Sequence, residues 1–68
     1  MRYKEIAEAL AEHIMSHHQP GDRLPGLREF ARQERISLIT ARNVYLLLER
    51  QGLLTLRQGA GTYVARAR

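Results

Sequence analysis

The spacing of the apolar residues changes at Gly52, and this change constrains the fold more than any other feature of the sequence. Before Gly52 the apolar residues recur every three or four positions, as on one face of an α-helix. After Gly52 they alternate with polar residues, as in a β-strand. The chain has 68 residues and no cysteine, so one small core must form without disulfides. We therefore expect a single, mainly α-helical domain that ends in a small β-hairpin.

Two breaks divide the part of the chain before Gly52 into three predicted helices. Pro20-Gly21 turns the chain after the first helix, and Pro25 precedes the second. Ser37 is a suitable N-cap for the third helix. The helices are expected to span about residues 2–18, 26–34 and 37–51. Each carries an apolar stripe that we expect to be buried: Tyr3, Ile6, Ala7, Leu10 and Ile14 on the first, Leu27, Phe30 and Ala31 on the second, and Ala41, Val44, Tyr45 and Leu48 on the third.

A short turn at Arg35-Ile36 separates the second helix from the third, which is the pattern of a helix-turn-helix. Ile36 is expected to fix this turn by packing into the core. After Gly52, residues 53–65 contain two β-prone runs around the glycine-rich stretch 58–61. This region predicts a hairpin with one apolar and one polar side, because Leu54, Leu56 and Tyr63 alternate with Thr55, Arg57 and Thr62.

The basic residues are concentrated in the second part of the chain. The formal net charge is +4, and ten of the eleven basic residues are arginines. Residues 1–22 contain two basic and four acidic residues, whereas residues 23–68 contain nine arginines and three acidic residues. Arginine suits phosphate oxygens and guanine edges. A nucleic acid is therefore the favoured partner over a membrane, because the first helix is acidic and the longest apolar run is short. A solvated basic surface without a partner is the alternative.

Five short motifs follow one another at characteristic spacings: Pro20 to Pro25, Leu27 to Ala31, Ile36-Ser37 with Thr40, Leu48-Glu49 with Gly52-Leu53, and Arg57 to Val64. In this order they make the sequence resemble, over essentially its whole length, the N-terminal DNA-binding domain of GntR-family bacterial transcription regulators. The resemblance implies a winged helix-turn-helix, three helices plus a hairpin wing, that binds specific sites in double-stranded DNA. The third helix would enter the major groove and the wing would contact the minor groove or the backbone. The alternative is a winged helix that binds another protein and has no affinity for DNA.

Residues near the start of the third helix and in the hairpin are the candidate DNA contacts. Arg42 can donate two hydrogen bonds to a guanine, and Thr40 can bind a phosphate or pack against a thymine methyl group. The glycines of the hairpin allow its backbone to approach DNA closely. The resemblance implies DNA contacts for Arg28, Thr40 and Arg42. The complete set of candidates is Arg28, Ser37, Leu38, Thr40, Arg42, Arg57, Gln58, Gly59 and Gly61.

Four positions depart from the family pattern. Leu38 and Ile39 stand where the family commonly has Arg and then Thr or Asn. They would either contact thymine methyl groups or, for at least one of them, pack inward against the second helix. Arg35 stands where the family often has Gly, so we expect either a left-handed backbone at Arg35, which costs roughly 1 kcal/mol, or a turn that is built differently. Glu34 replaces a usual Leu and removes one core contact.

No enzymatic activity, cofactor or metal is expected for this chain. His13 and His17 have a spacing that could hold a divalent metal, but no third ligand completes the site. Ser16 and Ser37 have no evident His and acidic partners for nucleophilic catalysis.

The resemblance also implies properties of a longer protein. Family members usually carry a C-terminal effector or dimerisation domain, and this sequence ends directly after the wing, so we expect an isolated domain that is monomeric or weakly dimeric. The full protein is expected to be a homodimer in the bacterial cytoplasm, associated with the nucleoid. Ser37-Leu38, Tyr45 and Leu48-Glu49 look similar to MocR-like members, whose larger domain resembles an aminotransferase that binds pyridoxal phosphate. That cofactor would belong to the other domain.

Overall fold

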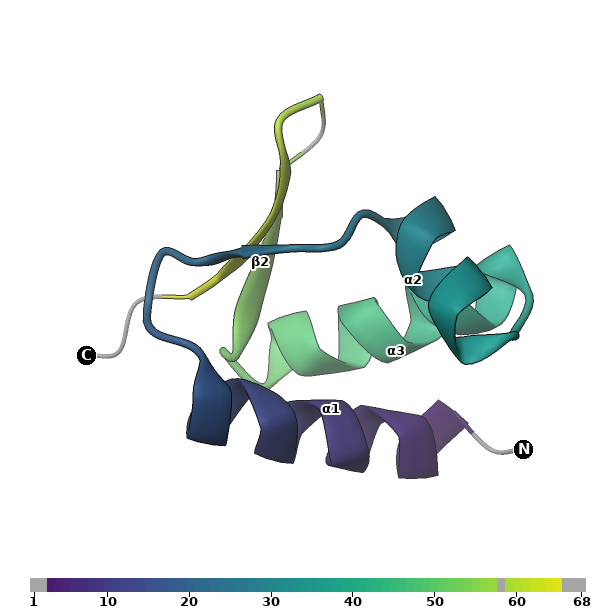
Figure 1. Cartoon of the computed structure of the whole chain (residues 1–68), viewed down its shortest axis with the longest axis horizontal. Coiled ribbons are helices and arrows are strands. Elements are labelled where there is room, and N and C mark those ends of the chain that lie inside the picture. The colour runs from purple at the N-terminus through teal and green to yellow at the C-terminus, as the bar shows by residue number, and fades with distance from the viewer. Residues whose placement is uncertain (1–2, 58, 66–68) are drawn as a thin grey trace.

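The computed structural model describes residues 3–57 and 59–65. Within these residues the chain forms three helices and a small antiparallel sheet. The elements are α1 (Tyr3–His17), β1 (Arg23–Leu24), α2 (Leu27–Glu34), α3 (Leu38–Arg50), β2 (Leu54–Arg57) and β3 (Gly61–Val64). The helices lie together, and the hairpin of β2 and β3 rises from them as a wing (Figure 1). The predicted winged helix-turn-helix is confirmed, and the helices lie within the ranges expected from the sequence.

The core is built around α3. Four residues of this helix have no exposed surface: Ala41, Val44, Tyr45 and Leu48. Helices α1 and α2 pack against α3, and α3 also contacts β2. The other buried apolar residues come from every remaining element: Ile6, Ala7 and Ile14 of α1, Leu24 of β1, Phe30 and Ala31 of α2, Leu54 of β2, and Val64 of β3. The predicted stripes are thus largely confirmed, although the side chain of Tyr3 is 38% exposed.

The turn between α2 and α3 has the geometry that its sequence requires. Arg35 adopts a left-handed conformation, with φ 57° and ψ 46°, as predicted. The N–H of Ile36 then donates to the carbonyl oxygen of Ala31 at 3.0 Å, and the Ile36 side chain packs against the core. Ser37 caps α3, because its Oγ accepts a hydrogen bond from the N–H of Thr40 at 3.0 Å.

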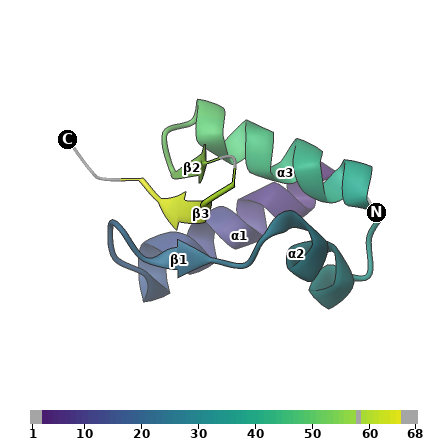
Figure 2. The same cartoon turned by 90° about the horizontal axis from the view of Figure 1, so that it is seen from above.

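Strand β1 is absent from the sequence-based prediction. It contains only two residues, Arg23 and Leu24, and it pairs with β3 rather than with a neighbouring segment. The sheet order is β1-β3-β2, so β3 is the central strand (Figure 2). The pairing continues beyond β1, since the N–H of Gly21 donates to the carbonyl oxygen of Val64. A two-residue strand has no period that could be read from the sequence, and its partner lies about 40 residues away.

The predicted sides of β3 are wrong. Residues directly opposite each other in an antiparallel sheet share a face. Thr62 lies opposite Leu24 and Leu56, and it is buried, with 3% of its surface exposed. Tyr63 lies opposite Arg23 and is therefore on the outer face. The sheet register thus places Thr62 with the leucines and Tyr63 with an arginine, the reverse of the prediction.

Two features attach the wing to α3. Gly52, with φ 82°, ends the helix, and the N–H of Leu53 donates to the carbonyl oxygen of Leu48 at 2.9 Å. The carboxylate of Glu49 then accepts a hydrogen bond from the backbone N–H of Leu56 at 3.1 Å. One turn of α3 therefore contacts β2 directly and sets the direction in which the wing leaves the helix. Across the part of the chain that the structure describes, none of the helices has the length and apolarity needed to cross a bilayer.

Candidate nucleic-acid interface

The N-terminal half of α3 presents both polar and apolar side chains to solvent. Leu38 is 44% exposed and Ile39 is 74% exposed. Of the two alternatives that the sequence left open for these residues, inward packing against α2 is therefore not supported. Arg42 is also exposed, one turn after Leu38. The surface that α3 offers thus combines an arginine with two large aliphatic side chains.

Ser37 and Thr40 form a hydrogen-bonded pair at the start of α3. The Ser37 hydroxyl donates to Oγ1 of Thr40 at 2.9 Å while its own Oγ accepts from the Thr40 N–H. This pair leaves the Thr40 hydroxyl proton available for an acceptor such as a phosphate oxygen. Thr40 therefore contributes to the cap of α3 and still has a hydroxyl proton that it can donate.

Arg42 and the wing lie on the same side of α3. Arg42 precedes Glu49 by seven residues, and such residues lie on nearly the same side of an α-helix, about 20° apart. Because Glu49 contacts the N–H of Leu56 in β2, this side is the one from which the wing rises. Leu38, four residues before Arg42, belongs to the same side.

Two hydrogen bonds stabilise the turn at the wing tip. The N–H of Ala60 donates to the carbonyl oxygen of Arg57 at 3.0 Å, and the Tyr63 hydroxyl donates to the carbonyl oxygen of Ala60 at 2.9 Å. Gly59 has φ 81° and Gly61 has φ 124°, conformations that other residues rarely adopt. Arg57 is exposed and lies opposite Gly61. The predicted site residue Gln58 lies outside the described residues.

A shallow groove separates the wing from α2, and arginines line both of its sides. Arg28 and Arg32 come from α2, Arg57 comes from β2, and Arg23 comes from β1. Glu29 lies in the same groove and forms an ion pair with Arg32 at 3.6 Å. Arg23 was not among the sequence-based candidates, because β1 itself was not foreseen.

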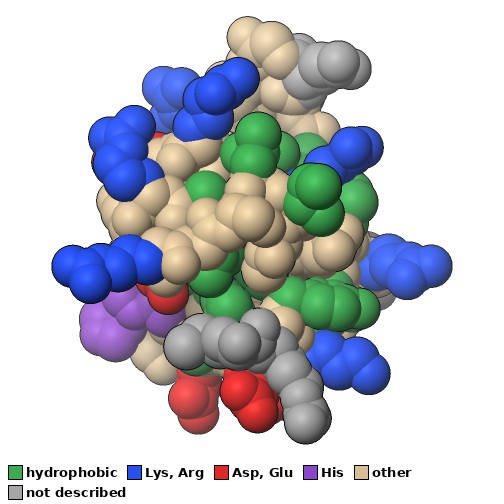
Figure 3. All heavy atoms as spheres, turned by 90° about the vertical axis from the view of Figure 1, so that its right-hand side faces the viewer, with side chains coloured by type: hydrophobic (Ala, Val, Ile, Leu, Met, Phe, Trp, Pro, Cys, Tyr) green, Lys and Arg blue, Asp and Glu red, His purple; other side chains and the backbone are tan. Residues whose placement is uncertain are grey.

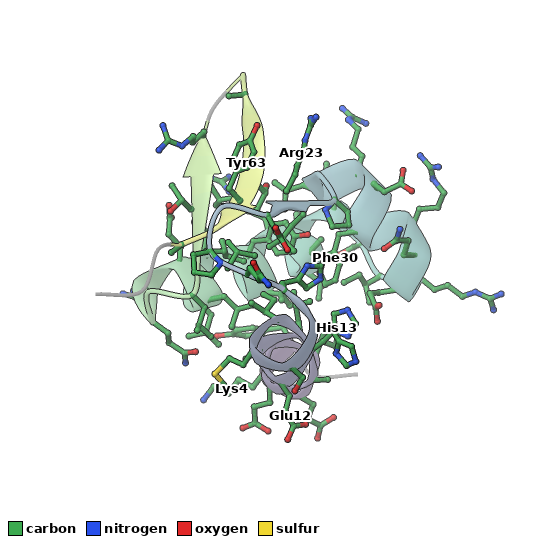
Figure 4. All side chains as sticks on the ribbon, turned by 60° about the vertical axis from the view of Figure 1, so that its left-hand side comes forward. Lys4, Glu12, His13, Arg23, Phe30 and Tyr63 are labelled. Atoms are coloured by element: carbon green, nitrogen blue, oxygen red, sulfur yellow. The ribbon has the colours of Figure 1, made fainter. Side chains whose placement is uncertain are left out.

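The acidic residues are concentrated elsewhere on the molecule. Glu5, Glu8 and Glu12 are exposed on α1. Figure 3 shows acidic side chains at the lower edge of the α2–α3 end of the molecule, and Lys and Arg side chains mainly above them and to the sides. In Figure 4, Arg23 and Tyr63 extend beside the wing, while Glu12 and Lys4 lie at the opposite end, around α1. The groove between the wing and α2 is thus predominantly basic, with four arginines and one glutamate, whereas α1 carries three exposed glutamates.

The histidines at the end of α1 stack on one another. The ring centroids of His13 and His17 are 4.7 Å apart, and Nδ1 of His18 lies 3.5 Å from the Asp22 carboxylate. Among the residues that the structure covers, no three His, Cys, Asp or Glu side chains are grouped so that they could hold a metal ion.

Comparison with known proteins agrees with this geometry. The chain is 45% identical over 65 residues to an uncharacterized HTH-type transcriptional regulator of Escherichia coli, YdcR. It is 44% identical over 62 residues to the HTH-type transcriptional regulator Rv0792c of Mycobacterium tuberculosis. These matches cover 94% and 90% of the chain, which spans only 14% and 23% of the length of these two relatives.

Solved structures share the fold. A GntR family transcriptional regulator from Listeria monocytogenes superimposes with a TM-score of 0.88 at 26% identity, covering 96% of this chain and 58% of that one. The DNA-binding domain of AraR, solved in complex with operator ORE1, gives a TM-score of 0.87 at 33% identity, covering 93% of this chain and 78% of that one. Residues 2–64 match the family described as bacterial regulatory proteins, gntR family. The chain therefore belongs to the gntR family of bacterial regulatory proteins.

Proposed function

We propose that this chain is the DNA-binding module of a bacterial transcription regulator and that it binds specific sites in double-stranded DNA. The observation that carries this proposal is the contact between Glu49 and the N–H of Leu56, which sets Arg42 and the wing on one side of α3. The arginines around the wing and the acidic surface of α1 on the opposite side support the same orientation. The similar AraR domain was solved in complex with operator DNA, which supports DNA as the partner.

In this proposal α3 enters the major groove. Arg42 donates two hydrogen bonds to O6 and N7 of a guanine, and the Thr40 hydroxyl donates to a backbone phosphate. Ser37 holds Thr40 in position and lies at the end of the helix nearest the DNA. Leu38 contacts a thymine methyl group, for which its exposed side chain is suited.

The remaining contacts come from the wing and α2. Gly59 and Gly61 bring the wing backbone close to the minor groove or to a phosphate, and Arg57 and Gln58 supply donors beside them. Arg28, exposed on α2, binds a backbone phosphate. These contacts fix the position of α3 on the duplex, whereas the base contacts of α3 select the sequence.

The experiment is a binding titration with duplexes selected from a random library. Wild-type affinity should fall steeply with salt, with a log–log slope of about −0.9 for each phosphate neutralised. Arg42→Ala should lower the preference for the selected guanine by about 1–3 kcal/mol, roughly 5- to 150-fold. Lys4→Gln removes one positive charge from the acidic side and should leave the preference unchanged. Failure of the wild-type chain to bind any duplex at low salt would refute the proposal and favour a protein partner.

The proposal extends to the larger protein. The chain acts by binding and not by catalysis, it requires no cofactor, and the regulator works in the cytoplasm at the nucleoid. The full protein is a homodimer that binds two half-sites about 34–36 Å apart, whereas the isolated domain is monomeric or weakly dimeric. We propose that the larger protein carries a C-terminal effector domain and that this domain is aminotransferase-like, as the resemblance to MocR-like members implies. Bound pyridoxal phosphate in the purified full protein, detected by its absorbance, would test that assignment.

A further inference from the structure

We propose that Arg23 of β1 binds a backbone phosphate of DNA in the groove between α2 and the wing. This inference rests on the proposed function and adds to it an anion site that the sequence did not reveal. The groove is lined by Arg23 and Arg57 on its sheet side and by Arg28 and Arg32 on its helix side. Its ligand is a phosphodiester, a singly charged anion whose two free oxygens can each accept hydrogen bonds from a guanidinium.

The register of the sheet places Arg23 close to the wing tip. Arg23 lies opposite Tyr63, on the outer face of the sheet. Its guanidinium extends over Gly61, where a methyl group in place of the Cα hydrogen would lie 3.2 Å from Nε and 3.4 Å from one terminal nitrogen. Figure 4 shows the Arg23 and Tyr63 side chains extending beside the wing, on the side of the molecule away from α1. A side chain from residue 23 thus becomes part of the wing.

The guanidinium of Arg23 forms no ion pair within the described part of the chain. Over residues 3–57 and 59–65, no carboxylate oxygen lies within 4.0 Å of the guanidinium nitrogens of Arg23. The neighbouring carboxylate of Asp22 is directed elsewhere, since it contacts Nδ1 of His18 and accepts the N–H of Gln19 at 2.9 Å. Arg23 is exposed, so its charge can reach a ligand without unpairing an internal contact.

The charge of the groove favours an anion even after its acidic residue is counted. Glu29 is the one carboxylate among the described lining residues, and it is paired with Arg32. The positive charges of the other three arginines are not balanced by a carboxylate partner among the described residues: Arg23, Arg28 and Arg57. Because Arg42 and the wing lie on one side of α3, a duplex that receives α3 in its major groove brings the bordering backbone strand towards the wing. The groove beside the wing is where that strand would pass.

The test compares Arg23→Gln with Arg23→Lys in the intact chain, using a duplex selected with the wild-type protein. Arg23→Gln should weaken binding about 3- to 10-fold at 0.1 M salt and reduce the log–log salt slope by about 0.9. It should leave the base preference unchanged, because a phosphate contact carries no sequence information. Arg23→Lys should retain the slope. Lys4→Gln controls for a general change of charge and should alter the slope by much less than Arg23→Gln.

Methylphosphonate substitution locates the phosphate. Neutralising the phosphate that Arg23 binds should lower the affinity of the wild-type chain for the duplex several-fold and leave the affinity of Arg23→Gln unchanged. This difference between the two proteins should occur at that one phosphate position. An unchanged slope in Arg23→Gln, or equal sensitivity of both proteins at every phosphate, would overturn this inference. With either of these results, the proposed function is still supported if the wild-type chain binds DNA and Arg42→Ala loses its guanine preference, and only the Arg23 site is refuted. If no duplex binds, both fall.

Discussion

The hydroxyl of Tyr45 connects α3 to the segment between β1 and α2, and its removal has a calculable effect. The side chain has no exposed surface, and its hydroxyl donates to the carbonyl oxygen of Pro25 at 2.7 Å. Tyr45→Phe keeps the ring and its stacking on Phe30, whose centroid lies 4.8 Å away. The substitution removes one hydrogen bond and leaves a partly buried carbonyl oxygen without its donor. The expected loss is about 1–2 kcal/mol in the free energy of unfolding.

The assay is reversible unfolding followed by far-ultraviolet circular dichroism, by heat and by urea. In a domain of this size, a loss of 1 kcal/mol lowers Tm by roughly 4–8 °C, so Tyr45→Phe should lower Tm by about 4–16 °C. The urea m-value should not change. Tyr63→Phe is the matched control, because its hydroxyl donates to the Ala60 carbonyl in an exposed position and should contribute less than about 0.5 kcal/mol. Equal stability of the two variants would refute the reasoning.

Three further predictions concern stability and specificity. Burial raises the pKa of Tyr45, so the folded state holds the phenol proton more tightly than the unfolded state does. The free energy of unfolding should therefore fall as the pH rises above the unfolded pKa of about 10. In urea titrations across this pH range, Tyr45→Phe should lose less of its stability than the wild type. Arg35→Gly relieves a left-handed backbone that costs about 1–2 kcal/mol, offset by roughly 0.4–1 kcal/mol of glycine entropy, so Tm should rise by a few degrees. Arg35→Ala keeps the strain, and a lower Tm in the glycine variant would contradict this account. Leu38→Ala should reduce the preference for thymine at one position of the selected site by about 1 kcal/mol, and footprinting that finds the same base preference as wild type would dismiss the thymine contact.

Local signals in the sequence predicted the helices and the turn, whereas long-range pairing determined what was missed. The stripe of α3, the cap at Ser37 and the left-handed Arg35 follow from residues within one or two turns of each other. Strand β1 exists because Arg23 and Leu24 pair with residues of the distant strand β3, so no nearby residue in the sequence indicates it. The burial of Thr62 has the same cause, since the residues on either side of it in the sheet are leucines.

The candidate site shows the same division. Helical spacing alone indicates which side of α3 carries Arg42. The position of that side relative to the wing depends on the contact between Glu49 and β2, and no sequence pattern predicted this contact. Arg23 went unnoticed because its position beside Gly61 follows from the register of β1. The roles of the nine residues selected from the sequence remain predictions that the binding experiments would decide.

The carboxylate of Glu49 has a second consequence, because it limits the pairing of β2 with a strand of another molecule. β2 is an outer strand, and unpaired N–H groups on such a strand are a template for pairing with another polypeptide. The N–H of Leu56 is already occupied by Glu49, and the strand is four residues long and ends in a charged Arg57. Two copies of this domain that come close together therefore have little opportunity to join their wings into a continuous intermolecular sheet. Replacing Glu49 with alanine would release that donor and create a starting point for aggregation.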